Sequence, residues 1–174
     1  MRSYNDETTF ALVAAAVNVL KLDATTILRA FGECWVSDVG TEHYSDPMKN
    51  TGISFVDFVK NLDHMHQRIR TTFPDYKPPS FRVIDLKDDQ IQVDYDSQRQ
   101  SLLPFVEGLF KGLATHYNTN IEIEHVSDDS HPLPCKRMFI HFTQAQWIKQ
   151  TTSSLRAQFS TIGDFLLANK AAQT

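Results

Sequence analysis

Apolar residues recur at helical spacing through the first part of the chain, in two stretches that each begin beside a residue able to cap a helix. We therefore expect helices over 6–20 and over 23–36, each burying one apolar stripe. These stripes comprise Phe10, Val13, Val17 and Leu20 in the first helix, and Ile27, Leu28, Phe31 and Trp35 in the second. The polar segment 37–51 contains glycine and proline, which is typical of a loop with at most a short helical piece.

A third helix is predicted over 53–73, where apolar residues again recur at spacings of three, four and seven. This stripe comprises Phe55, Val59, Leu62, Ile69 and Phe73, and the helix must end before Pro74. His66 falls within the stripe, four residues after Leu62 and three before Ile69. His64 lies on a different face of the helix and is expected to be solvated.

Shorter apolar segments farther along predict strands. The first two, 81–86 and 91–95, are separated by the turn residues 87–89 and form a plausible hairpin. A helix over 101–117 follows, and then strands over 121–125 and 138–142 with a loop over 127–135 between them. Helices first and a mostly antiparallel sheet later indicate an α+β fold.

Tyr95, Ser97 and Arg99 stand at alternate positions at the end of the second predicted strand. If the strand extends through them, their side chains share one face. Each side chain can donate a hydrogen bond to an anion, and arginine matches a carboxylate with two parallel bonds. The alternative is an ordinary strand end whose polar side chains are solvated.

His66 also permits two interpretations. A single histidine on an apolar helix face is usually a core residue hydrogen-bonded to a carbonyl group. It can also be a metal ligand, because neutral imidazole is the usual protein ligand of haem iron. One buried histidine and one three-part carboxylate clamp are what a haem with two propionates needs.

Taken together, these motifs resemble the haem nitric oxide/oxygen binding family, whose sensor domain also occurs in soluble guanylate cyclase. The resemblance extends from about residue 3 to about residue 142 and rests on the order and spacing of four segments. They are Leu62-Asp63-His64-Met65-His66, Pro78-Pro79-Ser80-Phe81, Tyr95-Asp96-Ser97-Gln98-Arg99, and Leu103-Pro104 running into Gly108-Leu109-Phe110-Lys111-Gly112. The Y-x-S-x-R signature is the most specific of these segments.

The resemblance implies a role for each matched position. The family's iron-ligating histidine falls on His66, its haem-distorting proline on Pro79, and its propionate clamp on Tyr95, Ser97 and Arg99. The family's oxygen-stabilising distal tyrosine has no counterpart in 102–109, where the nearest candidate is Phe105; Trp35 is the other distal-side candidate. The implied protein is a cytoplasmic, non-catalytic sensor that binds haem b and prefers nitric oxide. It would signal to a partner such as a histidine kinase or a diguanylate cyclase when the His66–iron bond weakens or breaks.

Two other functions remain open from the sequence. The fold can serve as a protein-interaction module without haem, or its clamp can hold another carboxylated ligand such as a bile pigment or a fatty acid. Zinc is disfavoured, because the candidate ligands His125, His131, Cys135 and His141 include no closely spaced cysteine pair. No nucleotide-binding or hydrolase motif is present, which is why we expect no enzyme.

The chain differs from the family pattern at both of its ends. Family members begin with further helices that cover the distal side of the haem, and this chain begins after them, near residue 3. Residues 1–143 are therefore expected to form the sensor domain in an N-terminally short version. Residues 144–174 form a tail in which Ile148, Leu155, Phe159, Ile162 and Leu166 follow a heptad pattern, with Thr152 in the remaining position. That pattern favours a coiled-coil linker that would pair two copies through 148–166, or an amphipathic cover helix packed back on the domain, and a disordered tail is the third alternative.

The charge, cysteine count and hydropathy of the chain limit its possible partners and cellular location. The net charge of −4 and the absence of a basic stripe disfavour nucleic acid. The two cysteines are too few and too far apart for a disulfide framework, which suits a reducing cytoplasm. No apolar run approaches the roughly 20 residues of a membrane span.

Overall fold

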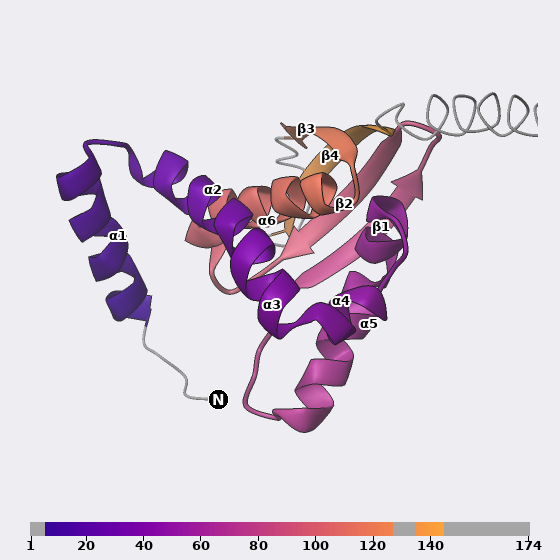
Figure 1. The fold of residues 1–174 in the computed structure, drawn as a ribbon, viewed down its shortest axis with the longest axis horizontal. Helices are drawn as coiled ribbons and strands as arrows, with labels where there is room; N and C mark the ends of the chain where they lie inside the picture. The colour runs from indigo at the N-terminus through magenta and orange to yellow at the C-terminus, as the bar shows by residue number, and fades with distance from the viewer. Residues whose placement is uncertain (1–5, 127–134, 145–174) are drawn as a thin grey trace, which may run out of the picture. The chain divides into compact units, whose positions relative to one another are not determined.

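The computed structural model describes residues 6–126 and 135–144. The chain divides into two compact units, residues 1–143 and residues 144–174, and all elements named below belong to the first except the last residue of β4. Figure 1 shows them in chain order. They are α1 (Asp6–Leu20), α2 (Ala24–Cys34), α3 (Thr41–His43), α4 (Ser45–Lys49), α5 (Phe55–Thr72), β1 (Ser80–Leu86), β2 (Gln90–Asp96), α6 (Leu103–His116), β3 (Thr119–Val126) and β4 (Cys135–Gln144). This arrangement confirms the α+β prediction.

Side-chain caps account for the starts of two long helices. The Asp23 carboxylate accepts a hydrogen bond from the Thr26 backbone N–H at 3.0 Å, so α2 begins where the sequence predicted. At α5, the Ser54 hydroxyl oxygen accepts from the Asp57 N–H at 3.1 Å and donates to the Asp57 carboxylate at 2.8 Å. These bonds satisfy backbone donors that the first turn of a helix leaves without partners.

The prediction of a loop over 37–51 is wrong. The chain continues from α2 through a wider helical turn, Trp35–Gly40, in which the Thr41 N–H bonds to the Val36 carbonyl, and then forms α3 and α4. Gly40 is buried and allows close packing against Met48, because a Cβ on Gly40 would lie 3.1 Å from the Met48 sulfur. Pro47 falls in the first turn of α4, where a missing N–H costs little. Glycine and proline often end helices, but neither Gly40 nor Pro47 does so here.

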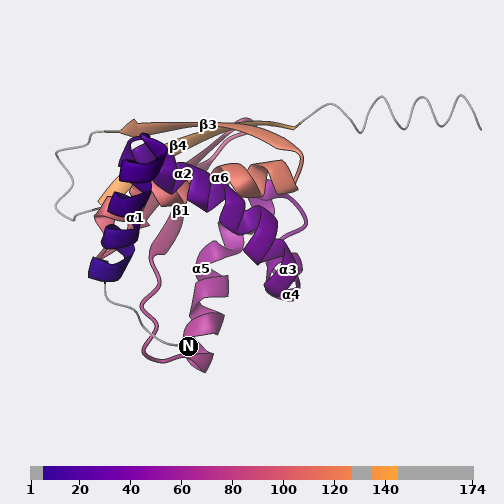
Figure 2. The same ribbon diagram turned by 60° about the vertical axis from the view of Figure 1, so that its left-hand side comes forward.

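The four strands form one antiparallel sheet in the order β1-β2-β4-β3. In the hairpin of β1 and β2, Ser80 stands opposite Asp96 and Phe81 opposite Tyr95, and a bulge falls between Val83 and Asp85. The predicted turn at 87–89 is confirmed by the hydrogen bond from the Lys87 N–H to the Gln90 carbonyl. In Figure 2 the helices α2, α5 and α6 lie on one side of this sheet.

The core lies between the sheet and these helices. The inward residues Ile91, Val93 and Tyr95 of β2 are almost fully buried. Around them pack Val36, Met48, Phe55, Phe58, Val59, Leu62, Phe81, Val106, Phe110, Leu113, Ala114, Met138 and Ile140. The predicted stripe of α5 is thus confirmed for Phe55, Val59 and Leu62, whereas Phe73 lies 41% exposed beyond the end of the helix.

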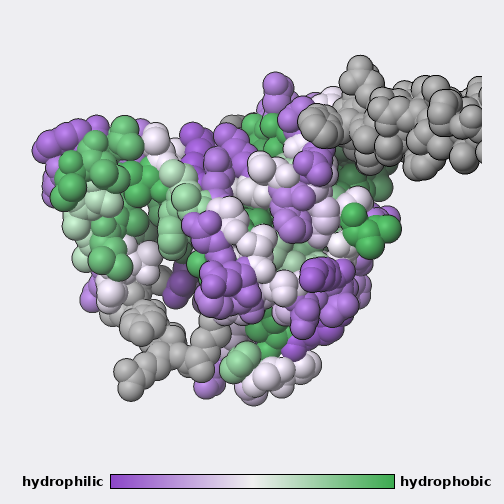
Figure 3. All heavy atoms as spheres, viewed as in Figure 1, coloured by the Kyte–Doolittle hydropathy of each residue, from purple (hydrophilic) through white to green (hydrophobic). Residues whose placement is uncertain are grey.

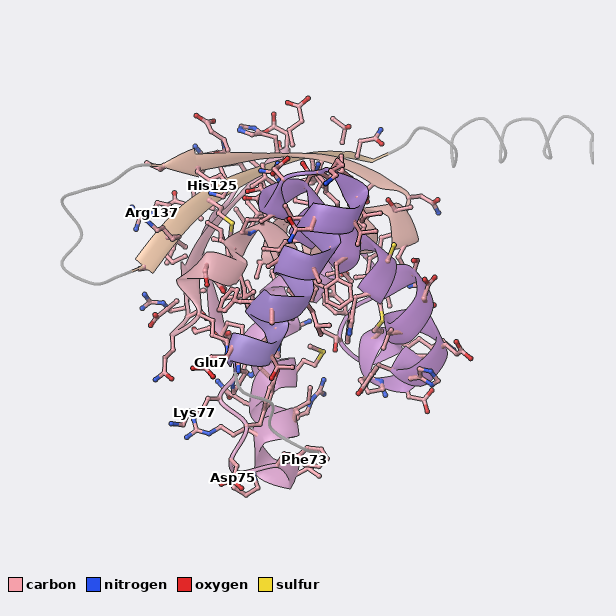
Figure 4. The ribbon with its side chains drawn as sticks, turned by 90° about the vertical axis from the view of Figure 1, so that its left-hand side faces the viewer. Glu7, Phe73, Asp75, Lys77, His125 and Arg137 are labelled. Atoms are coloured by element: carbon pink, nitrogen blue, oxygen red, sulfur yellow. The ribbon has the colours of Figure 1, made fainter. Side chains whose placement is uncertain are left out.

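Helices α2 and α6 cross at glycines. A Cβ on Gly32 would collide with the Phe105 carbonyl oxygen, and one on Gly108 would collide with the Arg29 carbonyl oxygen. Beside this crossing, the buried Glu107 carboxylate accepts from Arg29 at 2.5 Å and lies 2.7 Å from Nε2 of His125 on β3. One buried carboxylate therefore joins α2, α6 and the sheet, with His125 on the sheet side of the helices (Figure 4).

The predicted burial of the α1 stripe is wrong in part. Phe10 is 40% exposed and Leu20 is 57% exposed, while Val13 and Val17 are half-buried. Leu12 and Val19, which point away from this stripe, are also exposed, and Figure 3 shows apolar residues gathered over α1. On α2, Leu28 is buried as predicted, but Phe31 is 56% exposed. The tail residues 148–166 and the predicted loop at 127–134 lie outside the described residues.

Candidate functional site

His66 lies half-buried on the face of α5 that is turned toward the sheet. Its Nδ1 atom is 3.0 Å from the carbonyl oxygen of Pro79, so the ring donates its N–H there. Within the described residues, Nε2 of His66 has no hydrogen-bond partner. His64 is exposed, as predicted. A backbone carbonyl on one ring nitrogen commonly orients a histidine whose other nitrogen binds a metal.

Burial lowers the pKa of His66 below its usual 6.5. The hydrogen bond to Pro79 and the negative charge of Asp63 act in the opposite direction but do not outweigh burial. The imidazole is therefore neutral at neutral pH, and a neutral ring that donates from Nδ1 carries its lone pair on Nε2. This is the protonation state that a metal ligand needs.

Asp63 is a residue of the site that the sequence analysis did not identify. Its carboxylate accepts from the Phe81 backbone N–H at 2.6 Å and from the Ser80 hydroxyl at 3.0 Å. Asp63 therefore fastens the start of β1 to α5 one helical turn before His66. The available signal was its spacing of three residues from His66, which places both side chains on neighbouring positions of one helix face.

The structure divides the predicted clamp between a strand and a turn. Tyr95 lies within β2 and is only 2% exposed, whereas Ser97 and Arg99 follow the end of the strand at Asp96. The Arg99 backbone N–H donates to the Ser97 hydroxyl oxygen at 3.0 Å, so the chain bends here. Strand alternation consequently does not place these three side chains on one face, because the condition for it, a strand that extends through Arg99, is not met.

The two hydroxyl groups of the clamp nevertheless lie together. Burial raises the pKa of Tyr95, and a hydrogen bond with the Ser97 side chain partly offsets that rise. Ser97 thus contacts both Tyr95 and the backbone of Arg99. Arg99 itself is exposed at the protein surface.

Phe81 separates the histidine from the clamp. Its ring centroid is 5.8 Å from that of His66 and 5.2 Å from that of Tyr95. Pro79 lies two residues before Phe81 and holds His66 through its carbonyl group. The structure therefore brings four predicted residues, His66, Pro79, Tyr95 and Ser97, to one end of the β1–β2 hairpin.

The two predicted distal residues belong to different clusters. Phe105 on α6 is half-buried against Phe31 of α2, with ring centroids 5.2 Å apart. Trp35 is half-buried in the turn after α2 and stacks on Tyr44 at 5.7 Å. Among the described residues, the Trp35 and Phe105 rings make no ring contact with each other.

No group of three or more His, Cys, Asp or Glu side chains within 6–126 and 135–144 could hold a metal ion, and His131 lies outside these ranges. No single described helix is long and apolar enough to cross a membrane; the bent pair Glu7–Leu20 and Ala24–His43 meets that test only jointly, by length and composition.

Residues 1–125 match the sequence profile of the haem-NO-binding family. The chain belongs to this family. Its members are haem-based gas sensors, and the matched part is a sensor module and not a catalytic one. Such a domain binds haem, and the donors described above suit that group. The Phe81 ring contacts both His66, whose Nε2 has no hydrogen-bond partner within the described residues, and Tyr95, whose hydroxyl bonds with Ser97.

Curated relatives of this haem-NO-binding domain include guanylate cyclases. Soluble guanylate cyclase 89Db of Drosophila melanogaster is 29% identical over 87 residues, which cover 50% of this chain and 13% of that protein. Soluble guanylate cyclase gcy-31 of Caenorhabditis elegans is 27% identical over 129 residues, which cover 68% of this chain and 18% of that protein. The chain therefore spans only a small part of the length of these relatives.

Solved structures share the fold of this haem-NO-binding domain. An H-NOX protein from S. oneidensis in the Fe(II)NO ligation state superposes with a TM-score of 0.70 at 21% identity, over 82% of this chain and 78% of that one. The unliganded Fe(II) H-NOX protein from K. algicida gives a TM-score of 0.69 at 17% identity, over 83% and 77%. At these identities the likeness concerns the fold.

Proposed function

We propose that this protein is a nitric oxide sensor that holds haem b through His66. The observation that carries this proposal is the state of that side chain. Its Nδ1 is fixed on the Pro79 carbonyl, its ring is neutral, and its Nε2 has no partner among the described residues. An oriented neutral imidazole with one unused nitrogen is the arrangement that iron ligation requires.

The remaining residues hold the propionates. Tyr95 and Ser97 supply hydroxyl donors, and Arg99 supplies a positively charged fork that suits a carboxylate. Pro79 contributes rigid apolar contact and orients His66 at the same time. Haem, when held by these residues, would supply an iron that binds a diatomic gas.

The signal is proposed to start when the His66–iron bond weakens or breaks. His66 stands on α5, which is tied to the sheet through Asp63 and through the Pro79 carbonyl. A histidine released from iron is free to alter these ties, and α5 then shifts against β1. The receiver is a signalling enzyme such as a histidine kinase or a diguanylate cyclase, and the proposed compartment is the cytoplasm.

Preference for nitric oxide follows from the side chains near α6. Residues 102–109 contain no tyrosine, and Phe105 offers no hydrogen-bond donor. Bound oxygen carries partial negative charge that a donor stabilises, whereas nitric oxide needs no donor. Trp35 is the one residue we nominate that can donate on this side, through its indole N–H.

Haem titration followed by absorption spectroscopy tests the proposal. The protein should acquire a Soret band, His66→Ala should abolish it or require added imidazole, and the matched variant His64→Ala should retain it. Loss of the band in His64→Ala alone would show that the ligand is misassigned. A protein that acquires no Soret band would favour a module without haem; tight binding of a bile pigment or fatty acid would then indicate a carboxylated ligand.

Gas preference is tested on the reduced, haem-loaded protein. In air-saturated buffer the spectrum should remain that of unligated ferrous haem, and nitric oxide should bind tightly. A stable oxygen complex would contradict this preference, and its loss in Trp35→Phe would identify Trp35 as the unexpected donor.

A further inference from the structure

The register of the β1–β2 hairpin places the loop after α5 beside the clamp. Ser80 and Asp96 are opposite each other at the open end of the hairpin. In an antiparallel pair, residues that precede one strand run alongside residues that follow the other. Pro79, directly before Ser80, therefore adjoins Ser97, directly after Asp96, and the loop that leads into Pro79 enters beside the turn that carries Arg99. Figure 4 shows the loop rising from Phe73 and Asp75 at the end of α5 past Lys77 toward the sheet.

Tyr76 is the half-buried residue in the middle of this loop. Its neighbours Asp75 and Lys77 are exposed, so the loop turns Tyr76 inward. The Tyr76 N–H donates to the Phe73 carbonyl at 3.0 Å, which closes a turn and limits where the phenol can point. Burial raises the pKa of Tyr76, and the positive charge of Arg99 acts against that rise. The phenol thus turns inward from a loop that enters the sheet beside Ser97, and it feels the positive charge of Arg99.

We propose that Tyr76 is a further ligand-binding residue, whose hydroxyl donates to the carboxylate that Arg99 binds. This proposal rests on the proposed function and names an additional contact to a propionate. A phenol suits the position because it donates a hydrogen bond without adding charge, whereas Arg99 supplies the charge. The clamp then draws on two segments, residues 95–99 and the loop 73–79.

The second segment links the carboxylate contact to the iron ligand. The loop that carries Tyr76 ends at Pro79, whose carbonyl accepts the hydrogen bond of His66. A propionate held by Tyr76 therefore restrains the same loop that orients the histidine. Loss of the Tyr76 hydroxyl should weaken haem retention without removing the iron ligand.

The test uses Tyr76→Phe in the full chain loaded with haem, and measures the rate of haem transfer to an excess of an acceptor haem-binding protein. The variant should keep its Soret band and lose haem about tenfold faster than the unmutated protein, the effect of losing one hydrogen bond to a charged group. With haem dimethyl ester, which carries no free carboxylate, the two proteins should release the ligand at equal rates. Tyr117→Phe is the matched control, because its hydroxyl donates to the Gly52 carbonyl, away from the clamp.

The possible results distinguish a failure of the Tyr76 proposal from a failure of the proposal that His66 holds haem. Equal haem release by Tyr76→Phe and the unmutated protein would overturn the Tyr76 assignment and leave His66 ligation intact. Faster release that persists with the dimethyl ester, or that Tyr117→Phe reproduces, would show a packing effect and also overturn it. A protein that acquires no Soret band at all would overturn the haem proposal together with this one.

Discussion

Nδ1 of His66 lies 3.0 Å from the carbonyl oxygen of Pro79, thirteen residues later in the chain. The contact joins the C-terminal half of α5 to the residue before β1, so the candidate iron ligand is oriented by the segment that leads into the sheet. The ring of Pro79 fixes φ at this position, which narrows the backbone conformations open to the residue that orients His66. The orientation of His66 therefore depends on whatever fixes β1 against α5.

Asp63 provides that attachment, and its removal should affect both stability and haem binding. Asp63→Ala leaves the partly buried Phe81 N–H without its acceptor, which should lower the free energy of unfolding by about 1–3 kcal/mol. Haem should also dissociate faster, because Pro79 would no longer be held opposite His66. Urea denaturation and haem-transfer kinetics measure the two effects. Ser80→Ala removes only the hydroxyl bond and should have the smaller effect on both; a larger effect would contradict the assignment.

Arg99 should contribute more to haem affinity than to folding. Hydrogen bonds to charged groups are worth about 1.5–3 kcal/mol, so Arg99→Ala should weaken haem binding at least about tenfold. Because Arg99 is exposed, the unfolding midpoint should change little. Arg68→Ala, an exposed arginine on α5, is the matched control for lost charge. Identical haem affinity in Arg99→Ala and the unmutated protein would show that the Y-x-S-x-R motif is an ordinary strand end and not a propionate clamp.

Acid should destabilise the haem-free protein through His66. Its pKa in the folded protein is below 6.5, so in the window just below pH 6.5 the unfolded chain binds more protons than the folded one. Stability should fall as the pH drops through this window and gain nothing from His66 above it. Haem affinity should fall in the same direction, because a protonated imidazole cannot bind iron.

Denaturant titrations of the unmutated protein and His66→Gln at several pH values isolate this contribution, since the other titrating groups are common to both. The difference between the two stability curves should be steepest below pH 6.5. Parallel curves would mean that the imidazole is not protonated differently on folding.

The crossing of α2 and α6 should tolerate no added side chain at Gly108. A Cβ there meets the Arg29 carbonyl oxygen, and overpacking of this kind costs about 1–3 kcal/mol. Gly108→Ala should therefore lower the unfolding free energy even though alanine favours helix by about 1 kcal/mol. Lys111→Ala, at an exposed position of α6, should be close to neutral. A stabilised Gly108→Ala would show that the helices separate at this point.

Periodicity was sufficient for the long elements. The starts of α2 and α5, the hairpin turn at 87–89 and the alternation in β2 depend on interactions among residues close in sequence, which local patterns record. The failures concern packing. Gly40 and Pro47 are residue types typical of loops. In the structure, Gly40 allows close contact with Met48, and Pro47 lies in the first turn of α4, where proline is tolerated. The predicted burial of the α1 stripe is wrong in part, because an apolar helix face indicates that another surface should cover it but does not show that one does.

The candidate site divides in the same way. The sequence by itself determined which residue types stand at the ligand and clamp positions, since histidine on an apolar helix face and the Y-x-S-x-R motif are visible without coordinates. Only the tertiary structure decided that His66 is neutral and oriented by Pro79, that Asp63 fastens α5 to β1, and that Ser97 and Arg99 lie beyond the strand. The physical reason is that a pKa or a hydrogen bond between distant residues depends on burial and register. Both are set when separate segments pack together, and neither is a property of any one segment.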